Sequence, residues 1–482
     1  MRRCRLASRD AGAKPGRENG GRSSGGNAAA DAKLQATIAA FGLEGRRLYL
    51  PHMPYGGTYL LAAAFRSIGL DAWPTSHSDE RTLYLGGKVT SGDECYPQKI
   101  TVGDFLRHIE DEGQDKVAFL MPTANGPCRF GQYMQLIRRT FDDLGYDDVP
   151  IIAITSNDGY SSIGEYSTDL IRTAWRAVVA QDILMKMLLK TRPYERQKGD
   201  TDAVYLAALE DVGAAIAARE ITNKERLSRT VAALTHGRDA FRAIPADYDR
   251  SRPLIGVVGE IFCRLNTFAN ADLVRLVEEQ GGECWLSDIG EWVWYVDDEH
   301  RRHLEEMGRT YSAENAVRKI KSAVQHRDEH ALLAPFVTDF VGYEEPPDVA
   351  QVLAASFPYL PYTGALGEMV LSTGKAIYLH GKGADGIIDI SPFTCMNGIV
   401  TESVYPVVQR DMDGMPIRTF YFDGTQSDLE RDIGIFLELA RTYQQRKTRV
   451  RTYPSSFAAA AVGKDVGAAA VAAKSGDNGN GG

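Results

Sequence analysis

Three cysteines occur where the sequence predicts the start of a helix, and each has Pro, Gly or Asn close by. They are Cys95 in Gly-Asp-Glu-Cys-Tyr-Pro, Cys128 in Asn-Gly-Pro-Cys-Arg-Phe, and Cys395 in Ser-Pro-Phe-Thr-Cys-Met-Asn-Gly. The free N–H groups and the dipole at a helix start stabilise a thiolate. We therefore expect a lowered pKa at these thiols, which is the state in which sulfur binds iron or zinc.

Spacing alone does not identify a metal site. The sequence has no Cys-x-x-Cys pair and no Cys/His cluster, so it lacks a ferredoxin run and a zinc knuckle. The three residues could equally be small buried apolar side chains, as free cysteines often are. The context of Cys128 favours a cluster, because Asn125 and Gly126 permit a tight approach and Arg129 adds positive charge. Three thiolates would leave one iron of a cubane open to an oxygen-bearing substrate.

Alternating strand and helix patterns must position these cysteines. Between the strand-like runs lie helix patterns, a long one over 168–190 and a strand-free stretch over 200–245. This alternation is typical of parallel sheets. The predicted strands are 48–51, 70–73, 117–121, 151–155, 254–258, 284–286, 387–390 and 417–422.

The pattern predicts an α/β fold with two doubly wound lobes. The first covers 31–250 and contains a helical segment at 165–245, and the second covers 251–455. Residues 1–30 and 456–482 have the composition of disordered tails. Ligands of such sheets bind at the carboxyl ends of the strands. We therefore expect one shared site in a cleft between the lobes.

Bulk composition excludes several classes of protein. The 482 residues carry a net charge of −9, with 44% hydrophobic and 25% charged residues, which argues against a nucleic-acid-binding surface. Six cysteines in this length do not make a disulfide scaffold. No run reaches the roughly 18 apolar residues of a membrane span. A reducing cytoplasm is the expected location, and it permits free thiols.

Polar residues after the strand 254–258 are further candidates. Glu260 and Arg264 could contact substrate or orient a ligand, or they could only cap the next helix. Cys263 lies between them and could be a fourth ligand, although a packed thiol is the simpler interpretation. The choice depends on whether this turn faces the other cysteines.

Two residues of the first lobe are also candidates. Glu94 precedes Cys95 and could transfer protons there, or it could be a solvated loop acid. Tyr55 opens a helix at Tyr-Gly-Gly, where N–H groups could hold a phosphate. The G-x-G-x-x-G pattern is missing, so a tight turn explains the same residues.

Three segments resemble the 2-hydroxyacyl-CoA dehydratase superfamily, above all its branch of activase-related proteins. They are Ser-Gly-Asp-Glu-Cys-Tyr-Pro at 91–97, Gly-Pro-Cys-Arg-Phe-Gly-Gln-Tyr at 126–133, and Gly-Glu-Ile at 259–261. The likeness covers most of residues 45–450. The string at 126–133 is its most specific part, and the cysteine at 395 is its least specific.

The resemblance implies flavodoxin-like α/β lobes around a cleft and a [4Fe-4S] cluster held by three cysteines. Carried onto this sequence, the ligands are Cys95, Cys128 and Cys395. The local residue context, independently of the resemblance, makes Asn125, Arg129 and Tyr55 candidates for further cofactor contacts. Dehydratases of the superfamily receive one electron from an ATP-hydrolysing activator and eliminate the hydroxyl of a 2-hydroxyacyl-CoA. The sequence has no G-x-x-x-x-G-K-[ST] loop, so the activator would be a separate protein. A homo- or hetero-oligomer is expected.

Two alternatives remain open. A sister branch holds a double-cubane cluster and reduces small molecules, although the small number of cysteines argues mildly against it. A non-catalytic, cluster-binding partner of an activator or dehydratase would have the same sequence features.

Overall fold

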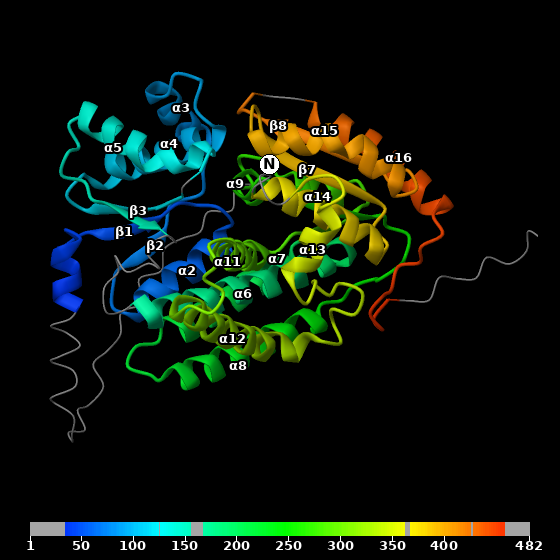
Figure 1. Cartoon of the computed structure of the whole chain (residues 1–482), viewed down its shortest axis with the longest axis horizontal. Helices are drawn as coiled ribbons and strands as arrows, with labels where there is room; N and C mark the ends of the chain where they lie inside the picture. Colours follow the sequence, from blue (N-terminus) through cyan, green and yellow to red (C-terminus); the bar gives the residue numbers. More distant parts are fainter. Residues whose placement is uncertain (1–33, 125, 156–166, 362–366, 426–427, 458–482) are drawn as a thin grey trace, which may run out of the picture.

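Two four-stranded parallel sheets form the frame of the molecule (Figure 1). The computed structural model describes residues 34–124, 126–155, 167–361, 367–425 and 428–457. The strand orders are β2-β1-β3-β4 and β6-β5-β7-β8, so the second sheet repeats the order of the first. The predicted α/β class is confirmed. The strands are β1 (Arg47–Leu50), β2 (Ala72–Pro74), β3 (Val117–Thr123), β4 (Ile151–Thr155), β5 (Leu254–Gly259), β6 (Glu283–Leu286), β7 (Gly386–Pro392) and β8 (Ile417–Phe422).

The first sheet is covered on both faces. Side chains of a strand alternate between faces, so Leu48 and Leu50 join one core cluster while Tyr49 joins another. In Figure 1 α2 lies on one side of this sheet, and α3, α4 and α5 lie on the other. These elements are α2 (Tyr55–Ser67), α3 (Glu80–Val89), α4 (Tyr96–Glu112), the 3₁₀ helix η1 (Arg129–Gln132) and α5 (Tyr133–Asp143).

The second sheet is covered in the same way. Ile255 and Ile388 pack in one cluster with α10 and α16, whereas Leu254 and Ile387 pack in another with α14. Because both faces are buried, β5 and β7 are nearly continuous apolar runs. The helices are α9 (Ile261–Leu265), α10 (Leu273–Glu279), α13 (Val349–Ser356), α14 (Glu368–Lys382), α15 (Met396–Asp411) and α16 (Leu429–Arg446).

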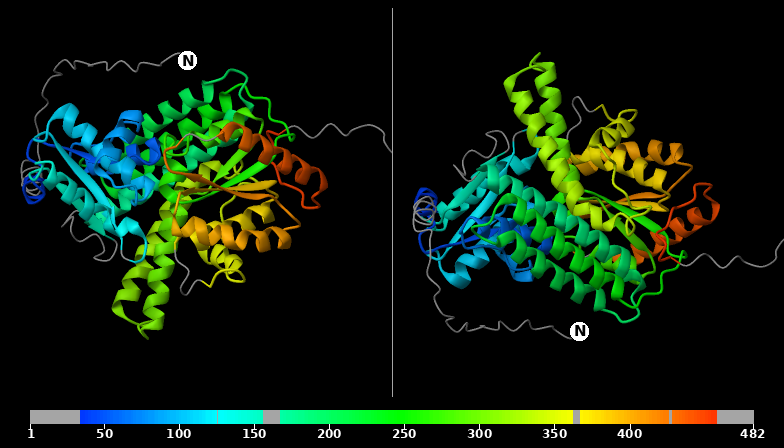
Figure 2. Two further views of the ribbon diagram at one scale, coloured as in Figure 1. Left: turned by 90° about the horizontal axis from the view of Figure 1, so that it is seen from above. Right: turned by 90° about the horizontal axis from the view of Figure 1, so that it is seen from below.

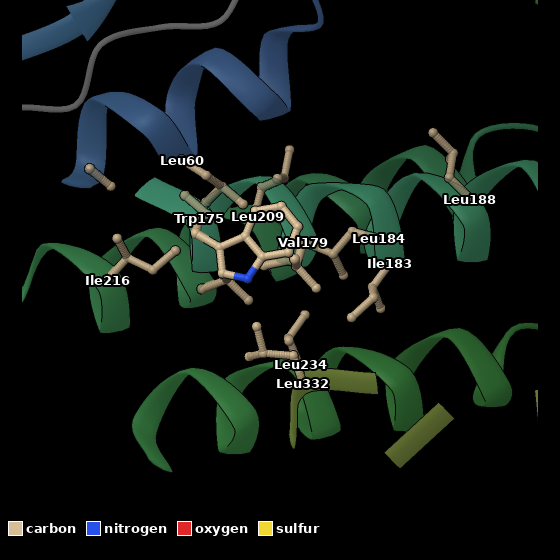
Figure 3. Close-up of a cluster of buried hydrophobic side chains, with 14 of the residues drawn as sticks. Leu60, Trp175, Val179, Ile183, Leu184, Leu188, Leu209, Ile216, Leu234 and Leu332 are labelled. Atoms are coloured by element: carbon tan, nitrogen blue, oxygen red, sulfur yellow. The ribbon is translucent and has the colours of Figure 1, made fainter. Parts of the chain in front are cut away.

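Long helices form a layer beside the two sheets. Trp175, Leu184, Leu209 and Leu234 meet in its core together with Leu332 (Figure 3). Helices α11 and α12 form a hairpin whose tip projects from the body (Figure 2). The elements are α6 (Ser167–Thr191), η3 (Arg192–Tyr194), α7 (Asp200–Ala217), α8 (Asn223–Ala243), α11 (Ile289–Glu306), α12 (Ala313–Leu333) and η4 (Ala334–Phe336).

Two glycines let α3 and α4 pack closely. A Cβ at Gly103 of α4 would overlap the carbonyl oxygen of Thr82, and one at Gly86 of α3 would overlap that of Lys99. The contact fixes the position of α4, whose first turn follows Cys95.

The predicted tails lie outside the described residues, except for 456 and 457. Phe457 is buried and packs against Tyr194 and Tyr248. Within the described ranges, no helix combines the length and the apolar character needed to cross a bilayer.

Candidate functional site

The three predicted cysteines share one backbone conformation. Cys95, Cys128 and Cys395 are the N-cap residues of α4, η1 and α15, with φ between −69° and −62° and ψ between 130° and 137°. The prediction that they stand at helix starts is therefore confirmed. Glu260 caps α9 with nearly the same angles, φ −62° and ψ 131°.

Equivalent strands of the two sheets supply Cys128 and Cys395. Cys128 follows β3, and Cys395 follows β7, which is the corresponding strand of the second sheet. Glu260 follows β5, the neighbour of β7. Carboxyl ends of adjacent parallel strands are where such sheets bind ligands.

The cysteine loops come together around Glu260. Burial is the largest cause of the raised pKa of Cys95, Cys128 and Cys395, and the negative charge of Glu260 adds to it at all three. Cys95 also has Cys395 among the groups that act on it electrostatically, and the Tyr133 hydroxyl is hydrogen-bonded to the Cys95 thiol. Cys95, Cys128 and Glu260 all raise the pKa of Tyr133, so these four residues share one neighbourhood.

Arg129 ties the three loops to one another. Its guanidinium donates hydrogen bonds to the carbonyl oxygen of Asp93 at 2.7 Å, and to the carbonyl oxygen and Oγ1 of Thr394 at 2.9 and 3.0 Å. Asp93 lies two residues before Cys95, and Thr394 directly precedes Cys395. One side chain next to Cys128 therefore joins segments of both sheets.

The predicted lowering of the thiol pKa is wrong for the metal-free protein. Burial, followed by the charge of Glu260, raises the pKa of Cys95 to about 12 and that of Cys395 to about 11. Burial also raises the pKa of Cys128, although part of this residue is exposed. The backbone N–H groups of Asn397 and Gly398 lower the pKa of Cys395, but they do not offset burial and acidic neighbours.

Two buried acids form a pair beside the cysteines. Glu260 accepts hydrogen bonds from the backbone N–H groups of Phe262 at 3.0 Å and Cys263 at 2.8 Å. Burial and the charge of Glu368 raise the pKa of Glu260 to about 7. Burial also raises the pKa of Glu368, which accepts a hydrogen bond from Asn397 Nδ2 at 2.7 Å. Such a pair can hold a proton near neutral pH.

Several buried polar atoms near these strand ends have no hydrogen-bond partner among the described residues. They include Arg264 Nε in α9, Ser391 Oγ in β7 and Asn397 Oδ1 in α15. Arg264 is only 8% exposed, and its charge lowers the pKa of Glu260 and of Glu368. Because unpaired buried polar groups are costly, their concentration here is typical of a site that takes a ligand.

A fourth thiol lies in the same place. Cys263 is fully buried, and after burial its pKa is raised by Glu260, Cys95 and Cys395. The sequence left this residue open between a ligand and a packed thiol, and the structure puts it next to the acid pair. The sequence signal for this position was the spacing between Glu260 and Cys263, because three residues correspond to about one helical turn.

Glu94 shapes the loop before Cys95. Its carboxylate accepts hydrogen bonds from the backbone N–H groups of Ser91 at 2.8 Å and Gly92 at 3.0 Å. Partial burial raises its pKa, but these and other hydrogen bonds outweigh burial, so the pKa lies below its ordinary value. Glu94 is therefore ionised at neutral pH, and its role in proton transfer stays a prediction.

Tyr55 and Asn125 are the remaining predicted cofactor contacts. The Tyr55 ring stacks on His77 and Tyr59, with ring centroids 5.0 and 6.0 Å apart. Asn125 lies outside the described residues. Cofactor contacts by these two residues stay predictions.

Comparison of the sequence with models of known protein families and with curated proteins found no match. Among the described residues, no group of three or more His, Cys, Asp or Glu side chains could hold a metal ion. The basis for a proposed function is the group formed by four thiols, two buried acids and Arg264, several of which follow β3, β5 and β7.

Proposed function

We propose that this chain is an iron–sulfur protein of two flavodoxin-like lobes that acts in the cleft between them. Cys95, Cys128 and Cys395 would hold a [4Fe-4S] cluster, as the resemblance to 2-hydroxyacyl-CoA dehydratases and their activase-related branch implies. The observation that carries the proposal is the convergence of three cysteine N-caps, from both sheets, on Glu260. A multi-iron cluster separates its thiolates more widely than a single ion separates its ligands. Cysteines that lie too far apart to hold one ion can therefore still hold a cluster.

The donor set fits such a group in charge as well as in type. Thiols must lose their protons when they bind metal. Their raised pKa makes this costly in the empty protein, so cluster binding would be coupled to proton release. Arg129 and Arg264 place positive charge beside an anionic centre. When bound, the cluster would supply one low-potential electron and an open iron for an oxygen atom of the substrate.

The residues of the chain would then handle position and protons. Arg129 holds the loops of Cys95 and Cys395 together through Asp93 and Thr394. Glu260 and Glu368 would hold the proton that leaves with a hydroxyl group as water. We propose a lyase-like reaction on an acyl-CoA-like substrate, with electrons from a separate ATP-hydrolysing activator in the cytoplasm.

A double-cubane reductase of small molecules is the second candidate. The presence of Cys263 beside Cys95 and Cys395 favours it, because a larger cluster needs more thiolates. It would contain about twice the iron of a single cubane per chain.

Iron and sulfide analysis with EPR, after anaerobic reconstitution, tests the proposal. We expect about four irons per wild-type chain and loss of the signal in Cys128→Ser, Cys95→Ser and Cys395→Ser. Cys284→Ser is the matched control, because Cys284 is a buried thiol within β6. Iron-free wild-type protein, or equal iron in the control and the three variants, would overturn the proposal.

Turnover separates the enzyme from the accessory role. The loaded protein is mixed with an ATP-dependent activator and 2-hydroxyacyl-CoA substrates of several chain lengths. Elimination of water supports the lyase, whereas a reducible cluster without turnover supports a non-catalytic partner.

A further inference from the structure

Two small cavities share part of their walls, and the second of them reaches Glu368 of the acid pair. The first is lined by Asp182 and Lys186 of α6, and the second by Arg264 and Glu368. The centre of a water molecule can occupy about 20 Å³ in the first cavity and about 10 Å³ in the second. Each cavity therefore has room for about one water. Both have polar walls, and a buried water needs such walls.

Ser287 and the adjoining Asp288 line both cavities. Ser287 is 2% exposed, and its hydroxyl oxygen has no hydrogen-bond partner among the described residues. This buried hydroxyl has no protein partner and borders two cavities. Such surroundings are typical of a hydroxyl group that binds water. Asp288 is the N-cap of α11 and is 3.3 Å from Lys186 Nζ.

The first cavity borders a largely buried charge network. Lys186 Nζ lies 2.6 Å from Glu345 Oε1, and Lys375 Nζ lies 2.7 Å from Glu291 Oε2. Lys375 also forms an ion pair with Glu345. Glu291 lines the second cavity, so the network reaches the wall that contains Glu368.

We propose that water molecules in the two cavities, bridged by Ser287, form a proton relay between Asp288 and Glu368. The inference rests on the proposed function, because it gives the acid pair a source from which its proton is replaced. In one transfer the O–H bond of protonated Asp288 breaks and a water gains the proton. That water passes a proton on through the Ser287 hydroxyl and the second water, and a new O–H bond forms on the Glu368 carboxylate. No electrons move, and one proton is lost at Asp288 and gained at Glu368.

The surroundings of Asp288 allow it to give up a proton near neutral pH. Burial, followed by the charge of Glu345, raises its pKa to about 6, while Lys186 and Lys375 lower it. Lys186 lies on α6 and Lys375 on α14, and the other charged groups that face Asp288 are Asp182 on α6, Glu329 on α12 and Glu291 on its own helix.

The first test uses the metal-free protein, so it does not depend on a cluster. A high-resolution crystal structure should show a water in each cavity within hydrogen-bonding distance of Ser287 Oγ. Infrared titration should show a protonated carboxyl with a midpoint near pH 6 that is lost in Asp288→Asn. The Asp288 side chain makes no capping hydrogen bond, and Asp182 accepts those of the first N–H groups of α11, so this variant keeps the helix start. Dry cavities, or an unchanged infrared titration in Asp288→Asn, would overturn the relay.

The second test measures the rate of proton transfer. After a pH jump, protonation of the buried carboxyls is followed by time-resolved infrared absorption in wild type, Ser287→Ala and Ser356→Ala. Ser356 is the matched control, because it is a buried serine with an unpartnered hydroxyl that lines neither cavity. We expect at least tenfold slower transfer in Ser287→Ala alone. Equal rates in the two variants refute the relay, whereas absence of iron in wild type refutes only the proposed function.

Discussion

Replacing Arg129 with Gln tests whether one exposed side chain organises the site. Its guanidinium donates three hydrogen bonds, which join the loops before Cys95 and Cys395. A glutamine is shorter and cannot span both acceptors. We expect the metal-free protein to fold normally and the loaded protein to lose its cluster faster.

The expected size follows from the number of bonds and their exposure. Charge-assisted hydrogen bonds contribute up to about 1.5–3 kcal/mol each when buried, but these bonds are exposed to water, so about 1 kcal/mol each is the better value. The loaded protein should therefore lose about 3 kcal/mol in total. In the metal-free protein the freed loops relax, so its unfolding free energy should fall by less than about 1 kcal/mol. The remaining 2 kcal/mol or so corresponds to about 30-fold weaker cluster retention.

The assay compares two matched arginines. Arg138 also donates three hydrogen bonds, to Asp142, Val149 and Tyr146 at 2.8–2.9 Å. All three acceptors lie within 11 residues of Arg138, so these bonds do not join the two sheets. Iron release to a chelator and urea denaturation are measured for Arg129→Gln and Arg138→Gln. The reasoning is refuted if both variants lose iron at the same rate, or if Arg129→Gln unfolds the metal-free protein.

Three further predictions concern stability. Burial raises the pKa of Asp104 from 3.8 to about 7, so the folded state binds the proton of this carboxyl more tightly than the unfolded state does. The unfolding free energy should therefore fall by at most roughly 4 kcal/mol as pH rises from about 4 to 7. Urea titrations at several pH values should show a smaller change for Asp104→Asn than for the wild type. Thermal melts should show Gly103→Ala destabilised by about 1–3 kcal/mol through its clash with α3, whereas Gly87→Ala, which faces open space, should be up to about 1 kcal/mol more stable. Lys375→Met leaves the buried Glu291 carboxylate without its cation, while Glu345 keeps Lys186, so denaturation should show a loss of about 3–5 kcal/mol that is partly recovered when Glu291→Gln is added. Equal stability of the single and double variants would contradict this.

The inner strands β3, β5 and β7 could be predicted because burial on both faces makes them short apolar runs. The strands predicted at 151–155 and 417–422 have the observed bounds of β4 and β8. Helices α11 and α14 were missed. The buried face of α14 contains Ser372, Thr373 and Lys375, and a polar buried face hides the helical pattern. Lys375 is satisfied by acids 30 and 84 residues away, which no local pattern can reveal.

At the site, sequence reasoning located the helix starts but not their electrostatics. Pro97 and the residues around Cys128 and Cys395 are local signals, and they were sufficient to place the cysteines. The raised pKa values depend on burial and on Glu260, which joins the cysteines only through the fold. Glu368 was missed for the same reason, since its partner Asn397 belongs to another helix.

The bonds from Arg129 to Thr394 span 265 positions of the chain. A ribosome-bound chain that has completed only its first half presents two of the three proposed ligands and neither acid of the pair. Loading of a metal centre would thus be postponed until synthesis and folding of the second half have finished. The colour of an iron-loaded molecule would then show that both halves of the chain had been synthesised and had folded together.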